Sequence, residues 1–129
     1  MKKICKNFLL CWVPVIIYCM IIYIQSSQPM PEYLPVVFGM DKMFHFFAYA
    51  VLSALFFRAL NTFKIKVNNE LLVVLASIVA AVLYGITDEI HQYYVISRVA
   101  DIVDVVADIL GSIFGVYSYR FLVNKYNIL

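Results

Sequence analysis

The chain has 129 residues and a formal net charge of +2; 64% of its residues are hydrophobic and 14% are charged. Soluble domains contain roughly 45–50% apolar and about 25% charged residues, so the composition excludes a soluble enzyme domain as the first interpretation. It also excludes a disordered, collagenous or coiled-coil chain, and the small net charge indicates no nucleic-acid partner. We therefore expect a single membrane domain over residues 1–129.

Four apolar segments follow one another along the chain, at residues 8–24, 44–60, 71–87 and 102–123. A helix that spans a bilayer needs roughly 20 mostly apolar residues, with a lower limit of about 17. Only helices and closed barrels satisfy their backbone groups in lipid, and these runs are too long and continuous for barrel strands. The sequence predicts an all-α fold, an integral membrane bundle of four helices.

The lysine and arginine residues predict how the bundle is oriented. Cytoplasmic loops carry an excess of these residues. Two of them, Lys42 and Arg98, lie on one side of the predicted spans, and the other eight lie on the opposite side: Lys2, Lys3, Lys6, Arg58, Lys64, Lys66, Arg120 and Lys125. We expect both chain ends to be cytoplasmic and segments 25–43 and 88–101 to face outward.

Acidic residues show the opposite distribution. All carboxylates but Glu70 fall at the outer ends of spans or in outer segments: Glu32, Asp41, Asp88, Glu89, Asp101, Asp104 and Asp108. Both histidines, His45 and His91, also lie near the outer face. At helical spacing, Asp41, His45 and Tyr49 share one helix face, and Asp88 and Gln92 share another.

The last span carries its polar residues in one narrow stripe. At 100° per residue, Asp101, Asp104, Asp108, Gly111 and Gly115 fall on the same side of the helix. Glycines allow a neighbouring helix to approach closely, so this stripe should face the bundle. An Asp at a helix centre costs roughly 2.5–3.5 kcal/mol on insertion, which predicts polar partners inside the bundle. Lys42, Arg98 and His45 are the candidates, and we expect Arg98 near an acid of this span.

Ten outer residues are candidates for a binding site: Asp41, Lys42, His45, Tyr49, Asp88, Glu89, Gln92, Arg98, Asp104 and Asp108. Three of them, His45, Asp41 and Glu89, are also candidates for acid–base catalysis. The chain has no His-x-x-x-His or Glu-x-x-His pair and no glycine-rich phosphate loop. We therefore expect neither a metal nor a cofactor.

The ensemble of these motifs resembles the VanZ-like family of small bacterial membrane proteins. The resemblance rests on four pieces in order: Ser26-Ser27-Gln28-Pro29, then Asp41-Lys42-x-x-His45-Phe46-x-x-Tyr49, then Asp88-Glu89-x-x-Gln92 with Arg98 after it, and finally Asp104-x-x-x-Asp108-x-x-Gly111-x-x-x-Gly115. The family commonly has Asn where this chain has Asp108. The resemblance implies a multi-pass protein of the bacterial plasma membrane, linked to teicoplanin resistance.

Three functions remain open at this stage. The first is a non-enzymatic protein in the lipid bilayer, either a monomer or a homo-oligomer, whose outer polar cluster binds a glycopeptide antibiotic or a lipid-linked cell-wall precursor. The second is a small enzyme acting on a lipid-linked envelope substrate. In that enzyme His45 would be the acid or base, Asp41 would orient it, and Lys42 and Arg98 would hold an anionic head group. The third is a proton-coupled carrier that uses Asp104 and Asp108.

Overall fold

The computed structural model describes residues 8–29, 39–62 and 69–126, and these residues form four α-helices without a strand. Helix α1 is Phe8–Ser27, α2 is Met40–Leu60, α3 is Glu70–Tyr93 and α4 is Ile102–Tyr126. The all-helical prediction is confirmed. Three of the helices extend beyond the predicted spans into polar sequence at the end that carries the acidic residues: α1 to Ser27, α2 from Met40 and α3 to Tyr93.

All four helices are long and apolar enough to cross a membrane. Their outward surfaces carry large apolar side chains; Leu9 is 71% exposed and Phe44 is 67% exposed. Soluble monomers rarely expose apolar patches of this extent, whereas a lipid-facing surface requires them. The chain is therefore a multi-pass membrane protein.

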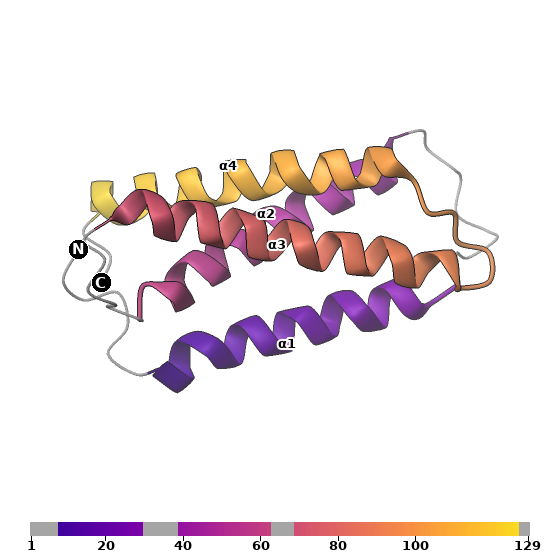
Figure 1. The fold of residues 1–129 in the computed structure, drawn as a ribbon, viewed down its shortest axis with the longest axis horizontal. Helices are drawn as coiled ribbons and strands as arrows, with labels where there is room; N and C mark the ends of the chain where they lie inside the picture. Colours follow the sequence, from indigo (N-terminus) through magenta and orange to yellow (C-terminus); the bar gives the residue numbers. More distant parts are fainter. Residues whose placement is uncertain (1–7, 30–38, 63–68, 127–129) are drawn as a thin grey trace.

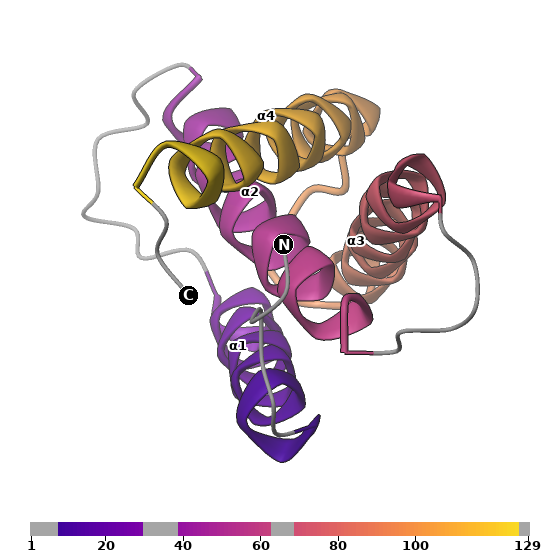
Figure 2. The ribbon, with the colours of Figure 1, turned by 90° about the vertical axis from the view of Figure 1, so that its left-hand side faces the viewer.

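Successive helices run in opposite directions, so α1 and α3 end where α2 and α4 begin (Figure 1). Viewed along the bundle, α2 lies between α1 and the α3–α4 pair (Figure 2). Within the described residues α1 packs against α2 and α3 but not α4, while α2 and α4 make the most extensive contact. The bundle is thus a compact α2–α3–α4 unit with α1 on its edge.

Two glycines explain the close contact between α2 and α4. A Cβ atom added at Gly111 would collide with the backbone carbonyl of Phe46, and one added at Gly115 would collide with that of Ala50. Both positions therefore require glycine for the two backbones to meet. Asp104 and Asp108 are buried on the same side of α4, which confirms that the polar stripe faces the bundle.

The two ends of the bundle differ in charge. We call the end where α1 and α3 finish the acidic end, because its described carboxylates are Asp41, Asp88, Glu89, Asp101, Asp104 and Asp108. We call the opposite end the basic end; among the described residues it carries Arg58, Arg120 and Lys125 with Glu70. Between the ends the core is apolar, with Leu52, Phe57, Val74, Ala81 and Val116 fully buried or nearly so.

Candidate functional site

The first turns of α2 bring three polar side chains to the acidic end. Helix α2 starts four residues before the apolar span, with Gly39 at a positive φ of 87° immediately before it. Asp41 and Lys42 consequently lie in the first helical turn, and His45 lies one turn further in. The His45 ring stacks in parallel over Tyr49, with ring centroids 6.0 Å apart.

Lys42 joins three segments through ion pairs. Its Nζ lies 3.0 Å from Asp41 Oδ2, 3.1 Å from Asp101 Oδ2 and 3.1 Å from Asp104 Oδ1. The Asp104 side chain is only 5% exposed, so an ammonium partner offsets the cost of burying its charge. Of the candidate partners that the sequence offered for Asp104, Lys42 forms the ion pair and Arg98 does not.

His45 lies at the centre of the remaining acids. Its Nδ1 is 2.9 Å from Asp108 Oδ1, and its Nε2 is 3.7 Å from Glu89 Oε1 and 3.9 Å from Asp104 Oδ2. His45 is thus within reach of the α3 terminus, as the sequence predicted. The expectation that Asp41 orients His45 is wrong: Asp41 contacts Lys42, and the deeper Asp108 contacts the imidazole because α2 and α4 pack closely there.

The last turns of α3 bring three buried polar side chains to the acidic end. Asp88, Glu89 and Gln92 are 5–6% exposed. Gln92 Nε2 donates to Asp88 Oδ2 at 3.2 Å, and the backbone amide of Asp101 donates to Glu89 Oε2 at 3.1 Å. We define the buried acidic cluster as His45, Asp88, Glu89, Asp104 and Asp108.

Asp101 lies just before α4 and caps it. Its Oδ1 accepts a 2.9 Å hydrogen bond from the backbone amide of Val103, the amide that an N-cap side chain usually satisfies. This amide first, and then the ammonium of Lys42, hold the pKa of Asp101 below its ordinary value of 3.8. Asp101 therefore stays ionised at neutral pH and fixes the start of α4 against Lys42.

Arg98 does not lie where the sequence placed it. Its Nε donates to Gln28 O at 3.0 Å and its Nη2 donates to Gln25 O at 3.1 Å, so the side chain binds one carbonyl in the last turn of α1 and one just beyond its end. The prediction of an acid of α4 as its partner is wrong. The physical reason is that the carboxyl end of a helix presents unsatisfied carbonyls, which attract a cation.

A second polar group lies between α1 and α3, next to the cluster. His91 Nε2 is 2.9 Å from Ser27 Oγ, and its ring packs at a tilt of 32° against that of Tyr23, with ring centroids 4.8 Å apart. Because the Ser27 hydroxyl donates its single proton to Tyr23 O at 2.7 Å, His91 Nε2 is the donor to Ser27 Oγ. Ser27 is therefore not held as a nucleophile.

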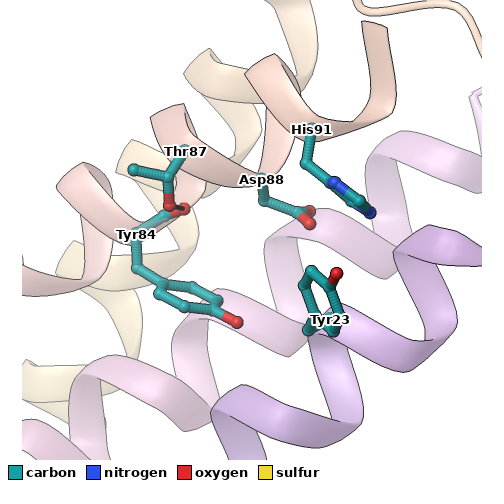
Figure 3. A pocket seen from close by; sticks show the side chains of 5 residues that line it. All are labelled: Tyr23, Tyr84, Thr87, Asp88 and His91. Carbon is teal, nitrogen blue, oxygen red and sulfur yellow. Dashed lines mark hydrogen bonds between the residues drawn. The ribbon is translucent and has the colours of Figure 1, made fainter. Parts of the chain in front are cut away.

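This second group borders a pocket of about 190 Å³, lined by Tyr23, Tyr84, Thr87, Asp88 and His91. Figure 3 shows Tyr23 on α1 facing Tyr84, Asp88 and His91 on α3. Asp88 belongs both to the pocket and to the buried acidic cluster. The sequence singled out Asp88 but missed the other four as site residues. The sequence could have indicated these four residues, because they lie near the outer ends of the first and third predicted spans.

A family model described as VanZ/LLP1 matches residues 8–123, which is nearly the whole chain and includes every residue of the buried acidic cluster. No curated protein matches the chain, and no solved structure matches it.

Proposed function

This chain belongs to the VanZ/LLP1 family, and from that premise we propose that it is a plasma-membrane protein of bacteria whose acidic end faces outward and binds a cell-envelope molecule. Two ligands are considered, a glycopeptide antibiotic of the teicoplanin type and a lipid-linked cell-wall precursor. Binding of the antibiotic would reduce how much of it reaches the cell-wall precursor, and binding of the precursor would reduce how much of it is free to meet the antibiotic. Either would contribute to resistance.

The observation that carries this proposal is the position of Asp88. Its carboxylate is buried, yet it lines the pocket between α1 and α3. Ligand sites combine an apolar wall with a few polar groups that fix orientation, and here tyrosine rings surround one acid and one histidine. At about 190 Å³ the pocket is smaller than the roughly 300–1,000 Å³ that encloses a drug-sized ligand. It therefore accepts one group of a larger amphipathic molecule.

The charges at this end favour a hydroxyl- or amine-bearing group over a phosphate. Lys42 is occupied by three carboxylates, and Arg98 binds carbonyls of α1. An anionic head group would meet the carboxylate of Asp88 in the pocket, and no lysine or arginine is among the described residues that line it. A sugar or amine, by contrast, can donate to Asp88 and stack on Tyr23 or Tyr84. This favours the antibiotic, or the sugar part of a precursor, as the group that enters.

A pocket-filling substitution tests this proposal. Thr87→Phe places a ring at the pocket, whereas Leu83→Phe places the same ring on an exposed position of α3 outside the pocket lining. We expect Thr87→Phe to weaken binding of teicoplanin to the purified protein in nanodiscs at least 10-fold and to remove any resistance at equal membrane abundance. Leu83→Phe should change neither. Equal binding by both variants, or no binding by the wild type, would refute the proposal.

The proposed orientation has its own test. Tyr94 is 78% exposed at the acidic end and Tyr126 is 57% exposed at the basic end. After replacement of the three native cysteines by alanine, Tyr94→Cys should react with an impermeant thiol reagent in intact cells. Tyr126→Cys should react only after the membrane is opened. The reverse pattern would invert the orientation.

One observation supports the enzyme alternative. The 2.9 Å contact between His45 Nδ1 and Asp108 Oδ1 is the arrangement in which a carboxylate orients an acid–base histidine. The His45→Gln variant separates the two functions. If it binds the ligand normally but loses resistance, and modified ligand accumulates only with the wild type, the protein is an enzyme. The carrier alternative has less support, because Asp104 is held by Lys42.

A further inference from the structure

The buried acidic cluster contains two carboxylate oxygens without a hydrogen-bond partner. Within the described part of the chain, Glu89 Oε1 and Asp108 Oδ2 are fully shielded and accept no hydrogen bond. Glu89 is 6% exposed and Asp108 is fully buried. Native proteins rarely leave a buried carboxylate oxygen unsatisfied, because its lost hydration is not replaced. These oxygens therefore indicate a missing partner.

The charge balance indicates that this partner is a cation. Asp88, Glu89 and Asp108 lie around His45, whereas the ammonium of Lys42 contacts Asp104 and two acids outside the cluster. Even a positively charged His45, with protons on both ring nitrogens, would supply only one positive charge against three carboxylates. Buried charges in membrane proteins are paired or bind ions, so a divalent cation bound by Glu89 would offset the charge and give Glu89 Oε1 its partner.

The geometry agrees with a coordination shell. His45, Asp88 and Glu89 each offer one ligand atom, and these atoms lie within 4.8 Å of one another. His45 Nε2 and Glu89 Oε1 are 3.7 Å apart, too far for a hydrogen bond. Adjacent ligands of an ion held at about 2.1 Å are separated by about 3.0–3.6 Å. A side-chain shift of about 1 Å would therefore close the shell.

Each of the three ligands is already oriented by a second contact. An ionised carboxylate can only accept, so His45 donates Nδ1–H to Asp108 Oδ1 at 2.9 Å and directs the lone pair of Nε2 toward Glu89. The Asp101 amide binds Glu89 Oε2, and Gln92 binds Asp88 Oδ2. Metal-binding histidines and carboxylates are usually oriented by outer partners of this kind.

We propose that His45 Nε2, Glu89 and Asp88 bind one divalent cation at the junction of α2 and α3, with Asp108 as the positioning residue of His45. A mixed imidazole and carboxylate set suits Zn²⁺ or Mn²⁺ better than Ca²⁺, which prefers oxygen ligands alone. No metal-binding motif is visible in the sequence because the ligands of this site come from two different helices, α2 and α3. The site does not rest on the proposed function, since it is measured with the metal alone.

The test measures metal content and affinity of the full chain in nanodiscs. After treatment with a chelator, the protein is loaded with Zn²⁺, Mn²⁺ or Ca²⁺, desalted and analysed by mass spectrometry, and affinities are obtained by competition with a chromophoric chelator. We expect about one Zn²⁺ or Mn²⁺ per chain. His45→Ala, Glu89→Gln and Asp88→Asn should each weaken binding at least 100-fold. Asp108→Asn keeps a hydrogen-bond acceptor for His45 but removes the carboxylate charge that makes the imidazole a stronger ligand, so it should weaken binding about 10–100-fold.

Matched controls separate the site from general attraction to an acidic surface. His91→Ala removes the other histidine of the acidic end, and Asp101→Asn removes an acid outside the ligand set; both should bind within about 3-fold of the wild type. If any ligand variant fails to fold, the metal content and the Co²⁺ spectrum of the wild-type protein still test the proposal. Bound Co²⁺ should then show the visible spectrum of a nitrogen- and oxygen-ligated ion. A wild type without stoichiometric metal, or controls that lose as much affinity as the ligand variants, would overturn the proposal.

Discussion

The two ends of the bundle differ in how far their charged side chains are exposed. At the basic end Arg120 Nε lies 2.8 Å from Glu70 Oε1, and both side chains are substantially exposed, at 28% and 41%. At the acidic end the Asp104 and Asp108 side chains are 5% and 0% exposed. An exposed pair costs little and contributes little, whereas buried acids require partners to be tolerated at all.

This difference in burial bears on the role of the charged residues at each end. Helix packing alone would be served by apolar residues at the acidic end, since replacing buried ion pairs by well-packed apolar groups is often neutral or stabilising. The presence of several acids around one histidine therefore supports the binding roles proposed above rather than a role in packing alone. The basic end shows no comparable arrangement within the described residues, and its charges are those expected at a membrane–water interface.

The largest expected effect comes from removing the deepest acid. Asp108→Leu leaves His45 Nδ1–H without its acceptor in the bundle interior, which should cost about 1–3 kcal/mol of unfolding free energy. Glu70→Leu at the basic end should cost at most about 0.5 kcal/mol, because its pair with Arg120 is exposed. Thermal unfolding in detergent and membrane abundance measure both.

Asp108→Asn is the control for this prediction. The amide oxygen can accept the same hydrogen bond from His45, so stability should stay close to that of the wild type. An Asp108→Leu protein as stable as the wild type would show that the two ends do not differ as the burial of their charges indicates.

A smaller effect is expected at Lys42. Lys42→Met leaves the buried Asp104 without its ammonium partner and should destabilise the protein by about 1–2 kcal/mol, a value reduced because Lys42 is 28% exposed. Arg120→Met at the basic end should change stability by about 0–1 kcal/mol. Adding Asp104→Asn to Lys42→Met should recover most of the loss in thermal unfolding. No recovery would mean that Lys42 acts mainly through packing.

These contrasts depend on contacts that the sequence predicted only in part. Hydropathy located all four helices, and the glycine spacing predicted the buried face of α4, because both are local periodic properties. Hydropathy could not locate the helix ends, since polar residues such as Asp41 and Gln92 continue a helix through backbone hydrogen bonds. Spacing within one helix also could not pair His45 with Asp108, which come from different helices.

Arg98 shows the same limit in a loop. The sequence placed it among acids because charge attraction was the visible signal, but the turn before α4 brings it to the carbonyls of Gln25 and Gln28. That position depends on where α1 ends relative to α3, which is a tertiary property. The charge count predicted the composition of the acidic end correctly, but not which cation contacts which acid.

The smallest expected effect is a pH-dependent one at the rim of the acidic end. The Val103 amide and then Lys42 lower the pKa of Asp101 below 3.8, so ionised Asp101 stabilises the folded state at pH values above the unfolded pKa. This contribution is lost as pH falls through the lower, folded pKa. Asp101→Asn should therefore lower the melting temperature slightly at pH 6. The difference from the wild type should shrink below about pH 4, because titrations shared by the two proteins cancel. Asp101→Ala, which also removes the cap of α4, should be destabilised further at pH 6. A difference between wild type and Asp101→Asn that grows on acidification would contradict a stabilising charge at Asp101, and the acidic end would then owe its order to the buried cluster alone.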